Sequence, residues 1–153
     1  FQMSVLIGNR LCTHAGVGND FLKSVGFWKM DSADESIISD YLNDLFHYKP
    51  NEFTFDGSYD RNNTGVTPSY YGDDDWQSPI WIRPRSLQRV NKKTDLKKNY
   101  IQIVGHTQQD HIDIKGRTTG GKYYYIDTLP SGEYLIDVDG EFEIGYATIV
   151  KYT

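Results

Sequence analysis

The chain begins with two short apolar runs joined by a turn. The runs are MSVLI at 3–7 and RLCT at 10–13, and the pair Gly8-Asn9 between them suits a tight turn. The aliphatic content of both runs favours strands. We therefore expect a strand pair, or hairpin, that ends at His14.

A helical spacing follows. Apolar side chains recur every three or four positions, which is typical of a helix with one buried face. The residues concerned are Ile37, Ile38, Tyr41, Leu42, Leu45 and Phe46. Just upstream, Ser32 and Glu35 have the spacing of a capping box. We predict a helix over about 34–47.

The middle of the chain is polar and lacks periodicity. Between Lys49 and Gln77 the composition turns to Asn, Asp, Gly, Ser, Pro and Tyr, as in a long surface loop. Loops of this length are often functional. A short apolar segment at 79–83 comes next, and we interpret the mixed stretch around 86–98 as a helix and its exit.

The last third consists of short β-branched and aromatic runs separated by turn pairs such as Asp139-Gly140. This pattern predicts strands at 100–104, 112–114, 123–126, 134–138 and 142–150. Helical elements early and consecutive strands late favour an α/β fold of the α+β kind, with largely antiparallel late strands. The whole chain, 1–153, is expected to form a single domain.

Composition and charge narrow the function classes. The net charge of −5 disfavours broad binding of nucleic acid or anionic membranes, although one basic stretch remains at 83–98. Cys12 is the only cysteine, which rules out an internal disulfide and fits a reducing compartment. With no spanning-length apolar run or signal peptide, we expect a cytoplasmic location. Phe1 opens inside an apolar run, which suggests a piece of a longer chain.

Two of the predicted strands lead into a histidine beside a glycine. His14 follows the second strand and precedes Ala15-Gly16, whereas His106 follows Gly105 in YIQIVGHTQ. Strand ends that lie side by side can bring rigid ligands to one ion, and neutral imidazole is a common ligand for zinc, iron or manganese. Either histidine alone suits a structural role, but the recurrence raises metal ligation as an alternative.

Four segments, taken in order, resemble the calcineurin-like metallophosphoesterases. CTHAGV at 12–17 and IVGHT at 103–107 are similar to the last two histidine motifs of the bacterial serine/threonine-phosphatase-like members. IWIRP at 80–84 resembles the family's Trp-x-Arg segment, and YYYIDTL at 123–129 resembles the strand bearing Ile-Asp-Thr-Gly. The resemblance covers most of the chain and implies part of a layered β-sandwich flanked by helices.

The resemblance assigns roles to single residues. It implies that His14 and His106 ligate the same ion of a two-metal centre and that Arg83 contacts the substrate phosphate, a role that suits its planar fork. Pairing with a nearby carboxylate is the alternative for Arg83. Asp127 would accept a hydrogen bond that orients a ligating imidazole, or would simply occupy a turn.

Three small residues complete the predicted site. Gly16 and Gly105 would allow close backbone approach. Thr107 would donate a local hydrogen bond.

The chain also departs from the family pattern. Gln108 stands where proline often follows Gly-His-Thr, and Leu129 stands where glycine follows Asp-Thr. The earlier motifs, Asp-x-His, Gly-Asp-x-x-Asp-Arg-Gly and Gly-Asn-His-Glu, have no counterpart. GDDDW at 72–76 imitates the second motif but has Trp76 in place of its second aspartate, and we interpret it as an acidic, solvated loop.

The leading hypothesis is therefore the C-terminal half of a metal-dependent phosphoesterase. Its cofactors would be divalent ions (Mn, Fe, Zn or Mg), and it would act on a phosphorylated substrate through a metal-activated water. This chain alone is expected to bind metal weakly and to be almost inactive. An N-terminal half, in cis or in trans, would supply the other ligands; without it, the exposed strand faces would favour self-association or misfolding.

Two other hypotheses of function stay open. A non-catalytic binding or scaffold module derived from the same fold would use the tyrosine-rich loop at 58–76. A carbohydrate-binding β domain is suggested only by the aromatic residues and the late strands.

Overall fold

Five strands form the main sheet of the chain, and a separate hairpin packs beside it. The computed structural model describes residues 2–28, 33–53, 71, 73–93, 101–116 and 122–147. The strands are β1 (Ser4–Ile7), β2 (Arg10–Thr13), β3 (Ile101–Val104), β4 (Asp113–Gly116), β5 (Lys122–Tyr125), β6 (Glu133–Val138) and β7 (Glu141–Tyr146). The helices are α1 (Asn19–Ser24), α2 (Glu35–Tyr48), the short 3-10 turn η1 (Pro50–Glu52) and α3 (Pro84–Lys93).

The main sheet is mixed. Its strand order is β1-β2-β3-β5-β4, and β6 and β7 form their own two-stranded sheet. β1 with β2, β4 with β5, and β6 with β7 are antiparallel, but β2 with β3 and β3 with β5 are parallel. The prediction of a mixed fold of the α+β kind is confirmed. The two parallel pairings at the centre of the sheet were not predicted.

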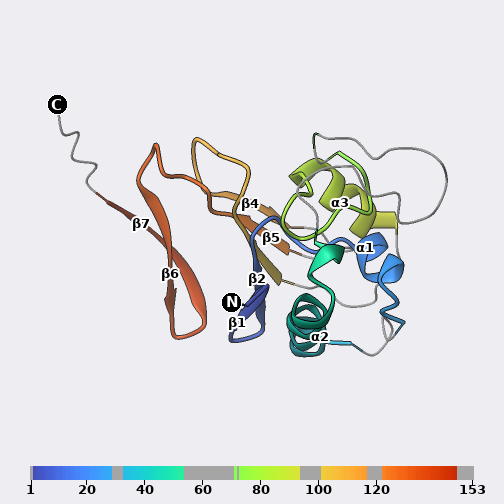
Figure 1. The fold of residues 1–153 in the computed structure, drawn as a ribbon. Coiled ribbons are helices and arrows are strands. Elements are labelled where there is room, and N and C mark those ends of the chain that lie inside the picture. The colour runs from blue at the N-terminus through green and yellow to red at the C-terminus, as the bar shows by residue number, and fades with distance from the viewer. Residues whose placement is uncertain are drawn as a thin grey trace.

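Alternate residues of the central strands are buried on the face of the sheet that the helices cover. Val104, Tyr123 and Tyr125 are buried in a cluster with Leu87 and Val90 of α3. A second cluster joins Leu11 of β2 to apolar residues of α1 and α2, including Phe21, Ile38 and Leu42. Figure 1 shows the helices on one side of the five-stranded sheet and the β6–β7 hairpin on the other.

Arg10 makes several of the contacts that join the hairpin to the sheet. The Arg10 guanidinium pairs with Asp137 at 3.1 Å, donates to the Gly140 carbonyl and lies 4.1 Å from the Phe142 ring centroid. Phe142 also packs edge-to-face on Tyr124 of β5, with the ring centroids 4.8 Å apart. These contacts lie toward the Arg10 end of β2, away from His14.

Two local predictions are corrected by the structure. The N-cap of α2 is Asp34, whose carboxylate accepts from the backbone N–H groups of Ser36 and Ile37. Asp34 is a strong capping residue, so the helix begins after it, and Ser32 lies outside the described residues. The short helix α1 was missed, because its six residues are too few to show a periodic pattern.

The remaining boundaries agree closely with the predictions. The residues at 10–13 form a strand with the predicted bounds, and the later strands differ by one or two residues at most ends. Residues 54–70 of the long loop, 94–100 after α3 and 148–153 after β7 lie outside the described residues. Within the described ranges, each helix is too short or too polar to span a bilayer.

Candidate metal centre

The ends of two adjacent strands bring His14 and His106 into contact. β2 and β3 are parallel neighbours, so their carboxyl ends meet at one edge of the sheet. His14 follows β2 directly, and His106 comes two residues after β3. His14 Nε2 lies 2.9 Å from His106 Nδ1, across 92 residues of sequence. The backbone N–H of Gly105 donates to the His14 carbonyl at 3.0 Å and ties the two strand ends together.

The separation of the two nitrogens fits ligands of one ion. With metal–nitrogen bonds of about 2.0–2.1 Å, two nitrogens on one ion lie about 2.9–3.4 Å apart, from right-angle to tetrahedral geometry. The observed 2.9 Å is at the lower end of that range. The same distance is a hydrogen bond when one nitrogen carries a proton, so a divalent ion would displace that proton and would lie off the line that joins the two nitrogens.

The surroundings of His106 keep its imidazole neutral. Burial lowers its pKa from 6.5 to about 4, the charges of His14 and Arg83 add to this, and Asp127 opposes it. The neutral ring is the form that binds a metal. Its other nitrogen, Nε2, is buried and has no hydrogen-bond partner among the described residues.

The backbone at His106 is also unusual. Its φ of +67° lies in the left-handed region, which non-glycine residues rarely adopt. Such conformations persist where surrounding contacts enforce them, and they cluster at functional sites. The ring of Trp81 is one such contact, with its centroid 5.2 Å from that of His106.

Arg83 lies at the same edge of the sheet, just before α3. Its Nη1 donates to Thr107 Oγ1 at 3.2 Å, and its Nε donates to the Tyr71 carbonyl at 3.1 Å. Thr107 accepts this bond, because a guanidinium has only donors; the predicted donation by the Thr107 hydroxyl stays a prediction. In the described part of the chain Arg83 forms no ion pair, and its Nη2 group has no hydrogen-bond partner there.

Asp127 and the two glycines take different positions around the histidines. Asp127 follows β5, and its carbonyl accepts from the Gln109 N–H at 2.8 Å. Its charge favours the protonated form of His106, but among the described residues no hydrogen bond joins its carboxylate to either imidazole. A Cβ at Gly105 would lie 3.5 Å from the His14 carbonyl, an ordinary contact.

Gly16 is sterically constrained. Its φ is +99°, and an added Cβ would lie 2.3 Å from Leu87 Cδ2 of α3. Gly16 therefore lets the backbone after His14 lie close to α3.

A buried glutamine that the sequence analysis overlooked holds the same segment. Gln102 of β3 is 2% exposed; its Oε1 accepts from Val17 N at 2.8 Å and its Nε2 donates to Val17 O at 3.1 Å. Asn91 of α3 also donates to Val17 O at 3.1 Å. A polar side chain within the apolar run YIQIV was the available signal, since a buried amide needs partners.

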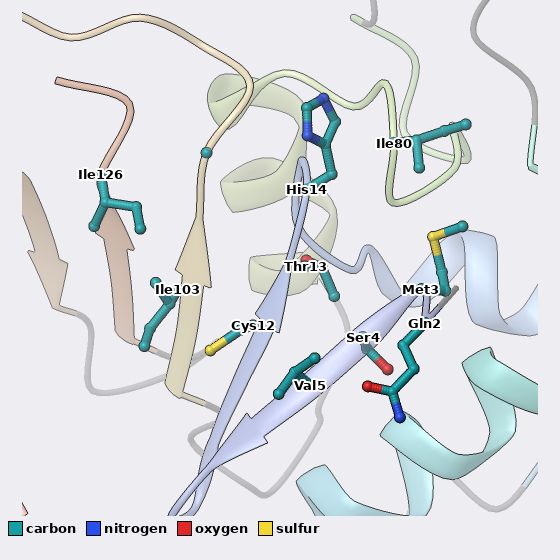
Figure 2. Close-up of a pocket in the computed structure, with 11 residues that line it drawn as sticks. Gln2, Met3, Ser4, Val5, Cys12, Thr13, His14, Ile80, Ile103 and Ile126 are labelled. Carbon is teal, nitrogen blue, oxygen red and sulfur yellow. The ribbon is translucent and has the colours of Figure 1, made fainter. Parts of the chain in front are cut away.

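An apolar groove opens on the sheet face opposite the helices. It has a volume of about 410 Å³. Figure 2 shows Val5, Cys12 and Ile103, from three neighbouring strands, side by side along it, with His14 at its upper end. Val5 is 47% exposed although it faces other apolar side chains. Burial raises the pKa of the Cys12 thiol, which keeps it protonated.

The two imidazoles form an incomplete donor set. Among the described residues, no group of three or more His, Cys, Asp or Glu side chains is placed to hold a metal ion. Metal sites need further ligands beyond two histidines, so the described residues at this edge form only part of a coordination shell. Comparison with protein-family models, curated proteins and solved structures found no match to the chain.

Proposed function

We propose that this chain supplies two imidazole ligands and a phosphate-binding arginine to a metal-dependent phosphoesterase of the serine/threonine phosphatase-like type. The observation that carries the proposal is the 2.9 Å separation of His14 Nε2 and His106 Nδ1 at the ends of parallel strands. The four ordered motifs add the reaction class, because they resemble calcineurin-like metallophosphoesterases.

In this proposal His14 and His106 hold one divalent ion (Mn, Fe, Zn or Mg) through the two facing nitrogens. His106 needs no deprotonation at neutral pH, because its pKa is near 4. When bound, divalent ions in such a centre activate a water molecule and neutralise phosphoryl oxygens. The edge is rigid, since backbone and side-chain hydrogen bonds fix the segments that carry both rings.

Arg83 is the group that would bind the phosphate of the substrate. Thr107 and the Tyr71 carbonyl each accept one of its N–H groups, which orients the guanidinium. Thr107 directly follows His106, so its hydrogen bond holds the Arg83 guanidinium beside the segment that carries a metal ligand. Because charge-assisted bonds from a guanidinium to a phosphate are strong and bidentate, Arg83 suits a phosphorylated substrate.

The missing ligands must come from outside the segments described above. The apolar groove beside His14 supports this, because it offers Val5, Cys12 and Ile103 as a surface for a second sheet. Such packing would complete the layered sandwich implied by the family resemblance. We therefore assign the groove to an N-terminal half, in the same protein or in a partner.

Manganese binding to the whole chain tests the proposed ligands. Paramagnetic Mn²⁺ should broaden the imidazole NMR signals of His14 and His106 before those of His47 and His111, which are exposed elsewhere. Replacing His14 by Ala should weaken binding by about tenfold or more, because loss of one of two ligands removes chelation. The matched control, His111→Ala, should bind like the natural chain. Equal broadening of all the histidines would refute the site.

Activity of the isolated chain provides a second test. With Mn²⁺ and an aryl phosphate, we expect little or no hydrolysis, because part of the coordination shell is missing. Clear hydrolysis that disappears in His106→Ala would show that the chain carries a complete centre, contrary to this proposal.

A further inference from the structure

The outer side of α2 carries exposed apolar side chains among its polar ones. Ile37, Tyr41, Asp44 and Tyr48 recur at helical spacing and so share one side of the helix. Tyr48 is 76% exposed and Ile37 is 38% exposed. Trp28, in the segment that follows α1, is 80% exposed. Large apolar side chains gathered on a surface mark a binding site more often than scattered ones do.

A preformed hollow lies where Trp28 meets this helix. It has a volume of about 360 Å³ and is lined by Gly26, Phe27, Trp28, Ile37, Tyr41 and Asp44. Tyr41 forms a fixed wall, because its hydroxyl donates to the Val25 carbonyl at 2.6 Å and its ring packs on Phe27 at 4.8 Å. One wall of the hollow is therefore fixed in place before a ligand binds.

Carboxylates give this surface a negative edge. Asp44 lines the hollow, and Asp40, one turn earlier on α2, is exposed beside it. Both carboxylates lie on the solvent side of the helix, and the chain as a whole carries a net charge of −5. A cation entering the hollow would meet the Asp44 carboxylate and the aromatic side chains of Trp28 and Tyr41.

We propose that Trp28, Ile37, Asp40, Tyr41 and Asp44, here termed the acidic aromatic face, bind a linear peptide segment in which arginine or lysine adjoins an apolar residue. The cation would lie between Trp28 and Asp44, and the apolar residue would contact Ile37. Charge complementarity selects this occupant over an acidic or neutral segment. The proposal goes beyond the phosphoesterase function and does not depend on it, since the two surfaces share no residue.

Binding of a defined probe to the whole chain tests this proposal. The probe is a short, unstructured peptide of arginine, leucine and glycine, and the matched peptide carries neutral citrulline at each arginine. In NMR titrations the indole N–H signal of Trp28 should shift with the arginine peptide and stay in place with the citrulline peptide. Added salt should weaken binding, because the carboxylates are exposed.

Variants of the face identify the contacts. Trp28→Ala should weaken binding by about 2- to 5-fold, as expected for the loss of one exposed cation–π contact. Asp44→Asn should weaken it by a similar factor at low salt, whereas Asp110→Asn, an exposed aspartate outside the face, should have no effect. Equal binding of both peptides would overturn the proposal, and so would an Asp44→Asn variant that binds the arginine peptide as tightly as the natural chain. It would also be overturned if no peptide bound and Trp28→Ala weakened contact between copies of the chain.

Discussion

At the scale of single residues, His106 differs most from an ordinary side chain of its type. It combines a left-handed backbone, a buried ring nitrogen without a partner and a pKa lowered to about 4. Burial is the main cause of the lowered pKa, and the charges of His14 and Arg83, which are distant in the sequence, add to it. A histidine held neutral in this way is available to a metal ion but unfavourable for stability in acid.

The first prediction concerns this acid sensitivity. The pKa of His106 is 6.5 in the unfolded reference and about 4 in the folded chain. Between these values the unfolded chain binds more protons, so the free energy of unfolding should fall as the pH drops from about 6.5 to about 4. Above pH 6.5 both states are deprotonated, and this contribution is constant.

Urea unfolding across this pH range, in the presence of a chelator, measures the effect. The His106→Gln variant should lose part of the pH dependence, because glutamine does not titrate. Glu133 makes a separate contribution to the loss of stability in acid, because its pKa is lowered by the Ile112 N–H and by His111. If His106→Gln and the natural chain show the same slope, burial does not perturb this imidazole.

At the scale of elements, the end of β2 is positioned by the neighbouring strand and by α3. Gln102 of β3 pairs with both the N–H and the carbonyl of Val17, and Asn91 of α3 adds a further bond. The Gln102 side chain thus satisfies the backbone of Val17 in place of a neighbouring strand, because Val17 lies beyond the end of β2. His14 is held at the sheet edge because the residues that follow it are fixed in this way.

The second prediction tests this support. Gln102→Met keeps the size of the side chain but removes both bonds to Val17, leaving its N–H buried and unpaired. We expect a loss of about 1–3 kcal/mol in the free energy of unfolding. Hydrogen exchange at the Val17 amide should become faster, and Mn²⁺ binding at His14 should weaken. Gln88→Met, which removes only a partly exposed bond to Tyr125, should cost less. Similar losses in both variants would mean that Gln102 has no special role.

At the scale of the whole molecule, the sheet is covered unequally on its two faces. The helices cover one face, and the β6–β7 hairpin lies on the other side (Figure 1), where Arg10 of β2 and Tyr124 of β5 contact it. Val5 and Ile7 of β1 remain 47% and 43% exposed. Apolar surface in water costs about 25 cal/mol for each Å², so this face favours a covering partner.

The third prediction is that the isolated chain associates through this groove. Sedimentation velocity should show a rise in mean mass with concentration, and Val5→Lys should reduce it because a charge would have to be buried. Leu129→Lys is the matched control, since Leu129 is 83% exposed but lies in a turn outside the groove. A monodisperse monomer at all concentrations would contradict the assignment of this face to a partner.

The amino-acid sequence by itself determined most local elements, because strand and helix periodicity, turn pairs and buried apolar runs act over a few residues. The strand at 10–13, the helix predicted over about 34–47 and both candidate ligands could be identified from the sequence; the helix in the structure is Glu35–Tyr48. The tertiary structure decided which strands are neighbours, and hence that His14 and His106 lie 2.9 Å apart across 92 residues. It also decided the anchoring of Arg83 by Thr107, the support from Gln102 and the acidic aromatic face. These features depend on contacts between distant segments, which no local pattern encodes.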